Sequence, residues 1–186
     1  MISVVIPTRN SARTLPAAFM SVFDAAIDGL VSEVIVADCG STDATLRIAE
    51  DAGATVVKAA SGRQLLAGAR AARKPWLLFL KADAAMEKGW EEEAWAFIAK
   101  GETAAGAFRL RFAGSGAVPR LREAAAAIRT RLSGPRGCNA LLIPVQLLDD
   151  AGAACPQAPD EGDLLHRLCC NRVVKLRSAV IANTAG

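Results

Sequence analysis

The sequence lacks the patterns on which several large classes of protein depend. His166 is its only histidine, so a metal site built from several histidines is excluded, and on a segment rich in leucine and cysteine it is expected to be a packing or surface side chain. Neither Gly-x-Gly-x-x-Gly nor Gly-x-x-x-x-Gly-Lys-Ser/Thr follows the first predicted strand. The chain is therefore not expected to be a dinucleotide oxidoreductase or a P-loop enzyme.

Cysteine pairs and long apolar runs are also missing. The five cysteines are odd in number and include no Cys-x-x-Cys spacing, which disfavours a disulfide framework and a structural zinc site. Uninterrupted apolar stretches such as Trp76 to Leu80 are far too short to cross a bilayer. The start, Met1 to Pro7, has no basic leader or cleavage site. These absences predict a cytoplasmic protein with free thiols.

The composition is that of one well-cored domain. The 186 residues are 52% hydrophobic and 22% charged, with a mean hydropathy of +0.26, which excludes disorder as the main state. The net charge of +3 is too small to indicate nucleic-acid binding. No repeat, linker or domain boundary is evident.

Up to residue 83, short β-branched runs alternate with amphipathic segments. Asn10 or Ser11 is the expected N-cap of the first helix, and Ser41-Thr42-Asp43 is expected to open the second. Expected strands cover Ile2 to Ile6, Glu33 to Ala37, Ala54 to Lys58 and Pro75 to Leu80; expected helices cover Leu15 to Ala26, Ser41 to Gly53 and Arg63 to Arg73. Four such repeats predict a largely parallel sheet with right-handed crossovers.

After residue 83 the rhythm changes. Expected helices are Glu87 to Lys100, Pro119 to Leu132, Gln146 to Ala151 and Asp160 to Cys170, and expected strands are Ala105 to Phe112, Ala140 to Ile143 and Val173 to Leu176. From Ala104 to Leu148 seven arginines stand against the single acid Glu123. This basic segment is either a solvated helix face or a site for phosphates or an anionic membrane surface. The few aromatic residues of the expected helix from Pro119 to Leu132 argue against base stacking.

The predicted strand ends carry polar groups. Thr8-Arg9-Asn10 follows the first strand, Asp38-Cys39-Gly40-Ser41-Thr42-Asp43 the second, and Lys81-Ala82-Asp83 the fourth. In an open parallel sheet, ligands bind beyond the carboxyl ends of the strands where strand order reverses. Taken singly, Asn10 and Ser41 can be helix caps and Gly40 a turn.

Taken together, these motifs resemble a known family. Ser3 to Asn10, followed by Glu33 to Thr45, resembles the opening of the family 2 glycosyltransferases, which have the GT-A nucleotide-diphospho-sugar transferase fold. Gly62 to Ala69 and Trp76 to Asp83 are similar to the middle of that domain. Weaker similarity to a small bacterial subgroup lies in Gly106 to Leu110, Arg129 to Leu132, Gly137-Cys138-Asn139 and Asp163 to Leu168. The resemblance implies a three-layer α/β/α sandwich with a mainly parallel mixed sheet.

The resemblance also implies roles for individual residues. Pro7 and Thr8 would line the base pocket, Asp38 would accept a hydrogen bond from a base N–H, and Arg63 would lie near the nucleotide or diphosphate. Asn10 and Gly40 belong to the same nucleotide-binding motifs. Asp83 would be the remaining acid of the Asp-x-Asp motif, whose carboxylates hold Mg²⁺ or Mn²⁺. Asp160 and Glu161 would supply the general base for displacement at the sugar C1.

Departures from the family pattern leave two readings open. Lys81 replaces the first acid of Asp-x-Asp, so either its ammonium contacts the diphosphate and binding is metal-independent, or the site has decayed and Lys81 is solvated. Cys39, the order Asp160-Glu161 and Gly137-Cys138-Asn139 also differ from common family residues. The prediction is a glycosyltransferase that moves a sugar from a nucleotide-diphosphate sugar to an acceptor hydroxyl with inversion at C1. The alternative, prompted by the altered Asp-x-Asp motif, is a non-catalytic nucleotide or nucleotide-sugar binding protein on the same fold.

The expected organisation is a single domain, residues 1–186, with a nucleotide-binding half (1–83) and an acceptor-side half (84–186). The expected partners are a nucleotide-diphosphate sugar and a phosphorylated or lipid-linked acceptor, with no nucleic acid. The arginine-rich segment suggests peripheral contact at the inner face of the membrane.

Overall fold

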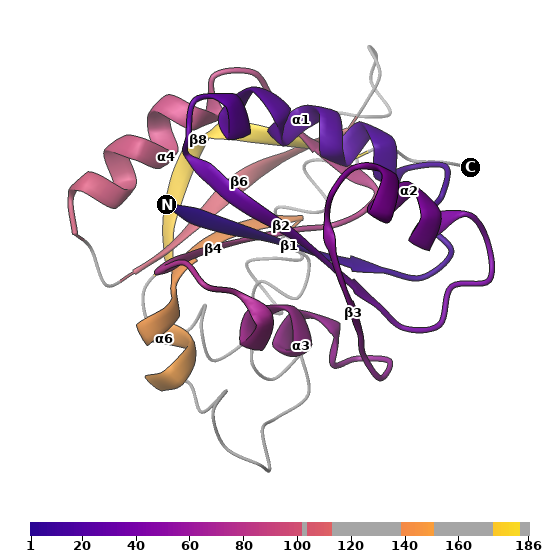
Figure 1. Ribbon diagram of the computed structural model, residues 1–186. Helices are drawn as coiled ribbons and strands as arrows, with labels where there is room; N and C mark the ends of the chain where they lie inside the picture. Colours follow the sequence, from indigo (N-terminus) through magenta and orange to yellow (C-terminus); the bar gives the residue numbers. More distant parts are fainter. Residues whose placement is uncertain (102–103, 113–138, 151–172, 183–186) are drawn as a thin grey trace.

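The structure is a computed structural model that describes residues 1–101, 104–112, 139–150 and 173–182. Its centre is an eight-stranded sheet with the order β3-β2-β1-β4-β7-β6-β8-β5, and helices cover both faces (Figure 1). This is the three-layer mixed α/β arrangement expected from the sequence.

The first four strands form the parallel part of the sheet. They are β1 (Ile2–Thr8), β2 (Val31–Asp38), β3 (Thr55–Lys58) and β4 (Trp76–Leu80). β1 lies between β2 and β4 and pairs in parallel with both. The chain therefore adds β2 and β3 on one side of β1 and then returns to add β4 on the other, so the strand order reverses between β1 and β4.

The remaining strands complete a mixed sheet. They are β5 (Ala84–Met86), β6 (Ala105–Phe112), β7 (Ala140–Pro144) and β8 (Val173–Ala182). β7 runs antiparallel to β4 and β6, β5 runs antiparallel to β8, and β6 and β8 are parallel. Arg109 and Arg111 are exposed on β6, as the alternating pattern predicted.

Alternate residues of the central strands serve two separate cores. Ile2, Val4 and Ile6 pack with α1 (Leu15–Ile27), α2 (Thr45–Asp51) and α4 (Trp90–Ala99) on one face. Val5 packs on the other face with α3 (Gln64–Ala71) and α6 (Val145–Asp150). Figure 1 shows these two groups of helices above and below the sheet. β4 is buried along almost its whole length because both of its faces are covered.

The apolar pattern also explains how α4 meets α1. Trp90, Ala94 and Phe97 are buried at the helical spacing, and Trp90 donates its ring N–H to the carbonyl oxygen of Ser21 on α1 at 3.3 Å. The Trp90 ring meets Phe108 of β6 edge to face at a centroid distance of 6.1 Å. One aromatic side chain thus joins two helices and the sheet.

Several expected boundaries were wrong. β5 was not expected, because three residues are too few to show an alternating pattern, and β8 continues to Ala182 although Leu176 was the expected end. α1 begins after Thr14 and α2 after Ala44, and neither helix has a side-chain cap bond. Asn10, Ser11 and Ser41 are therefore not the caps of these helices, and the second helix begins after Ser41-Thr42-Asp43 rather than with it.

Two of the predicted helices, Pro119 to Leu132 and Asp160 to Cys170, lie outside the described residues. Within the described part of the chain, no helix is long and apolar enough to span a membrane.

Candidate functional site

The candidate site lies at the carboxyl ends of the parallel strands, around the point where strand order reverses. Thr8 ends β1 and is paired in register with Asp38, which ends β2. Lys81 follows the last residue of β4 on the other side of β1. Three polar loops that are distant in sequence are brought to the same edge of the sheet by this topology.

Asp38 is the centre of the hydrogen-bond network at this edge. One carboxylate oxygen accepts hydrogen bonds from the hydroxyls of Thr8, at 2.9 Å, and Ser41; the other accepts from the backbone amides of Gly40, at 2.9 Å, and Ser41, at 2.8 Å. Asp38 is only 4% exposed. Its four bonds match the roughly four lone-pair positions of a carboxylate.

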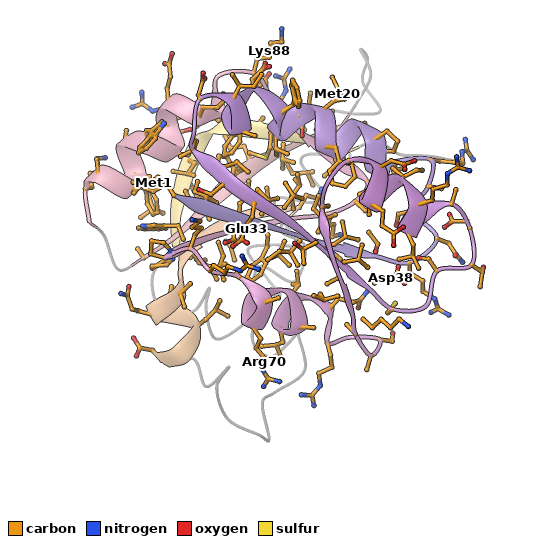
Figure 2. All side chains as sticks on the ribbon, in the orientation of Figure 1. Met1, Met20, Glu33, Asp38, Arg70 and Lys88 are labelled. Carbon is orange, nitrogen blue, oxygen red and sulfur yellow. The ribbon has the colours of Figure 1, made fainter. Side chains whose placement is uncertain are left out.

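These contacts determine the charge state of Asp38. Burial favours the neutral acid, but the hydrogen bonds from Ser41, Thr8 and Gly40 outweigh it, so the pKa of the Asp38 carboxyl lies below its ordinary value. The group is therefore an anion at neutral pH. Figure 2 shows Asp38 on the side of the sheet where the β1 and β2 loops meet.

Asn10 links the loop after β1 to the loop after β2. It has a left-handed backbone with φ of 52°, and its amide N–H donates to the Ser41 hydroxyl at 2.8 Å. Its side-chain oxygen accepts from the Thr42 amide, also at 2.8 Å. Asparagine tolerates this backbone region better than most residues. The resulting double bridge holds the two loops together.

A second pair of bridges lies further along the same loops. The amide of Ser11 donates to the Thr45 hydroxyl at 2.7 Å, and the amide of Ala12 donates to the Asp43 carboxylate at 3.1 Å. Asp43 also accepts from the Thr45 hydroxyl, and this bond is the main reason that the Asp43 pKa is lowered. The hydroxyl and acidic residues after β2 therefore fix the β1 loop in place.

Gln64, at the start of α3, ties the third loop to the same edge. Its side-chain amide donates to the carbonyl oxygen of Thr8 at 3.3 Å, and its side-chain oxygen accepts from the amide of Gly62 at 3.1 Å. The neighbouring Arg63 is exposed just before the helix. Gln64 holds the loop that carries Arg63 against the end of β1.

The loop after β4 combines a fixed backbone with free side chains. The amide of Lys81 donates to the carbonyl oxygen of Asn139 at 3.0 Å, and the carbonyl oxygen of Lys81 accepts from the amide of Ala84 at 3.1 Å. The side chains of Lys81 and Asp83 are exposed, whereas Ala82 between them is buried. An ammonium and a carboxylate are thus presented to solvent from one rigid turn.

The described residues do not by themselves form a metal site. Among them, no group of three or more histidine, cysteine or acidic side chains lies close enough to hold a metal ion. Asp83 is the one acid of the turn after β4, and the Lys81 cation precedes it by two residues. A divalent ion held here would need oxygen ligands from elsewhere, so no chemical step is assigned to a metal.

The structure brings Pro7, Thr8, Asn10, Asp38 and Gly40 together, with Gly40 in a left-handed turn at φ of 89°. The predicted bases Asp160 and Glu161 lie outside the described residues. Sequence reasoning did not assign site roles to Ser41, Thr42 and Gln64. The dense run of hydroxyl groups directly after β2 was the available signal for the first two.

Comparison with known proteins agrees with this architecture. The family model of glycosyl transferase family 2 matches residues 3–157. TarS from S. aureus is 20% identical with a TM-score of 0.71, over 99% of this chain and 37% of the TarS chain. TarS 1-349 in complex with UDP-GlcNAc gives the same identity and TM-score over 100% of this chain and 59% of that one.

A third similar structure is glucosyl-3-phosphoglycerate synthase from Mycobacterium tuberculosis in complex with Mn²⁺, UDP and phosphoglyceric acid. It is 23% identical with a TM-score of 0.65, over 98% of this chain and 68% of its own. This chain spans less than two thirds of the length of both TarS chains. No curated protein matches the sequence. The matched family model covers most of the chain and the fold agrees with it, so this protein belongs to glycosyl transferase family 2.

Proposed function

We propose that this protein transfers a sugar from a nucleotide-diphosphate sugar to an acceptor hydroxyl. The observation that carries the proposal is the interlocked edge formed by Thr8, Asn10, Asp38 and Ser41, which stands beside the Lys81 turn where strand order reverses. Rigid loops that present backbone groups and a cation at such an edge suit a nucleotide and its phosphates. Family membership and the UDP complexes of similar structures support the same assignment.

On the donor side, Pro7, Thr8, Asn10, Gly40 and Asp38 form the base pocket in this proposal. Each carboxylate oxygen of Asp38 already accepts two hydrogen bonds. A base N–H would therefore have to share an oxygen with these donors or replace one of the four bonds. The main task proposed for Asp38 is to keep the two loops at the spacing that the base requires. Arg63, exposed on the loop that Gln64 anchors, is placed near the phosphates.

Lys81 and Asp83 are the proposed diphosphate side of the site. The exposed ammonium of Lys81 can neutralise part of the diphosphate charge as a mobile point charge. Asp83 is the carboxylate available to a divalent ion such as Mn²⁺ or Mg²⁺. When bound, such an ion would supply further positive charge to the departing diphosphate.

The second half of the chain, residues 84–186, is proposed to bind the acceptor. Asp160 or Glu161 would take the proton of the acceptor hydroxyl, whose oxygen then bonds to the sugar C1. The C1–O bond to the diphosphate breaks and the nucleoside diphosphate leaves with that electron pair, which inverts the configuration at C1. The exposed Arg109 fits a phosphorylated or lipid-linked acceptor, and Arg111, which pairs with Glu87, lies two residues along the same strand.

A second candidate function is nucleotide-sugar binding without transfer. It is favoured by Lys81, which places a cation where the family has a carboxylate. The two candidates differ in turnover: both bind the donor, but only the transferase consumes it.

The deciding experiment is calorimetric titration with UDP, GDP and the matching monophosphates, each with Mn²⁺ and with EDTA. We expect diphosphates to bind more tightly than monophosphates. Lys81→Met should weaken diphosphate binding about tenfold, as loss of one charge-assisted contact would do, with a smaller effect on monophosphates. Lys74→Met is the matched control, because Lys74 precedes β4 and so lies at the opposite end of the strand that Lys81 follows.

Binding that is unaffected by EDTA and weakened by Lys81→Met would identify Lys81 as the diphosphate partner. Binding that requires Mn²⁺ and is lost in Asp83→Ala would identify a metal-dependent site. Equal affinity for monophosphates and diphosphates would refute the donor assignment. Donor hydrolysis and transfer assays on Asp160→Ala and Glu161→Ala then separate transfer from binding, since unchanged transfer in both variants would refute their role as base.

A further inference from the structure

The outer face of α1 carries an apolar stripe that the described residues leave uncovered. Met20 is 69% exposed, Phe23 54% and Ile27 70%, and these are three of the largest exposed apolar side chains in the described part of the chain. Pro16 is exposed one turn earlier. The spacing 16, 20, 23 and 27 places all four on one side of the helix. Figure 2 shows Met20 on the side of α1 that points away from the sheet.

Within the part of the chain that the structure describes, the stripe does not belong to either core. The opposite side of α1, formed by Leu15, Ala18, Val22 and Ala25, is the side buried against the sheet. The stripe is about 16 Å long, because eleven residues separate its ends at 1.5 Å each. Two apolar faces on one helix are typical of a helix that has a partner on both sides.

The charges beside the stripe indicate which partner fits. Arg13 lies exposed just before the helix, whereas Asp24 and Asp28 lie exposed toward its carboxyl end. Among the described residues, no ion pair involves any of these three side chains. The side of the helix next to the stripe is therefore positive near the amino end and negative near the carboxyl end. When two copies of the helix lie antiparallel, the positive end of each lies next to the negative end of the other.

We propose that α1 is the contact surface of a symmetric dimer, in which the α1 helices of two copies pack antiparallel across these stripes. The stripe is centred midway between Ser21 and Val22, so a two-fold axis there places Met20 opposite Phe23 and Pro16 opposite Ile27 of the second copy. The same axis brings Arg13 within about two residues, or 3 Å along the axis, of Asp28 of the second copy. In a parallel pairing, Asp24 and Asp28 of one copy would instead lie next to Asp24 and Asp28 of the second copy, so that like charges would meet.

Most of the stripe lies away from the candidate site, and only its start, at Pro16 and the preceding Arg13, adjoins the β1 loop. The site is formed by the carboxyl ends of β1, β2 and β4, whereas the stripe lies on the outer face of the helix layer. The acids on the flank disfavour an anionic lipid surface as the partner. Because one helix of thirteen residues is a small interface, we expect association in the micromolar range.

The test is sedimentation velocity on the whole chain from about 1 to 300 μM. We expect a concentration-dependent monomer to dimer equilibrium. Ile27→Ser and Phe23→Ser should each weaken association at least about tenfold, since each change occurs twice in a symmetric dimer. Val174→Ser is the matched control, because Val174 is an exposed apolar residue on β8, and it should leave association unchanged.

Charge reversal tests the orientation. Arg13→Asp and Asp28→Arg should each weaken association a few-fold at low salt, and the double variant should restore it. Both changes favour the helix dipole, so loss of folding is not expected, and circular dichroism would check this. A protein that stays monomeric at all concentrations, a dimer indifferent to Ile27→Ser, or a monomer that binds anionic vesicles through the stripe would each overturn the proposal. Failure of the double variant to restore association would overturn the antiparallel arrangement.

Discussion

Replacement of Asp38 tests whether this carboxylate holds the two strand-end loops together. Asp38→Ala removes four hydrogen bonds and leaves the Thr8 hydroxyl, which is 1% exposed, without its acceptor. An unsatisfied buried hydroxyl costs about 1–3 kcal/mol, and loss of the bonds to the half-buried loop amides adds about 1 kcal/mol. We expect the free energy of unfolding to fall by about 3 kcal/mol at pH 7.

Asp38→Asn is the conservative comparison. Its side-chain oxygen can still accept from the amides of Gly40 and Ser41, while its NH₂ group meets the hydroxyls of Thr8 and Ser41, which can rotate to accept. The charge is lost but most bonds are kept. We expect a loss of about 1 kcal/mol, clearly smaller than that of Asp38→Ala.

The pH dependence gives an independent check. Because the pKa of Asp38 is lower in the folded state than its ordinary value, its contribution to stability is present above the unfolded-state pKa of about 3.9. The contribution is lost as pH falls through the lower folded-state pKa. The difference in unfolding free energy between the wild type and Asp38→Asn should therefore shrink as pH falls from 5 to 3.

Urea unfolding followed by circular dichroism at pH 7, 5 and 3 measures all of these quantities. If Asp38→Ala were as stable as the wild type at pH 7, the network would not hold the loops. If the difference between wild type and Asp38→Asn were the same at every pH, the ionised carboxylate would not be the source of the stability.

The remaining predictions concern positions away from this carboxylate. A Cβ on Gly68 would lie 2.2 Å from Val5 Cγ1, so Gly68→Ala should lower the free energy of unfolding by about 2 kcal/mol, and the double variant with Val5→Ala should lose less than the sum of the single changes. Additive losses in urea unfolding would refute that contact. Glu93 accepts the amides of Arg177 and Ser178 at 2.7 Å each, so Glu93→Ala should cost about 2 kcal/mol, and a melting temperature equal to that of the wild type would contradict this. Although burial of Glu93 acts to raise its pKa, those hydrogen bonds lower it overall, so the effect of Glu93→Ala should diminish below about pH 4.

Much of the fold was predictable because its signals are local. The β-branched runs of β1 and β2 and the apolar run of β4 show their character within five to eight residues, and α1 shows its buried side at the helical spacing. The predicted parallel core with helices on both faces is confirmed. β5 was missed and the length of β8 was underestimated. These two strands pair with each other although they lie about a hundred residues apart in the chain, so no local pattern shows the pairing.

The candidate site was predicted as a set of residue types at strand ends, and the structure decided how they act. Asn10 and Ser41 are typical helix caps in sequence, but here they bond to each other across the two loops, over 31 residues of sequence. No local pattern contains that information, because the contact exists only once β1 and β2 are aligned. Lys81 is similar, since its backbone is held by Asn139, 58 residues away.

By itself the sequence determined the alternation of strands and helices, the resemblance to a family, and the presence of a cation in place of an acid after the fourth strand. These depend on residue identity and short spacing, which the chain carries before it folds. Only the tertiary structure decided that Asp38 uses its oxygens to join loops, that the Lys81 and Asp83 side chains are exposed on one turn, and that α1 shows a second apolar face to solvent. Each of these depends on which surfaces meet when distant segments pack, and burial and hydrogen-bond partners are properties of that packing.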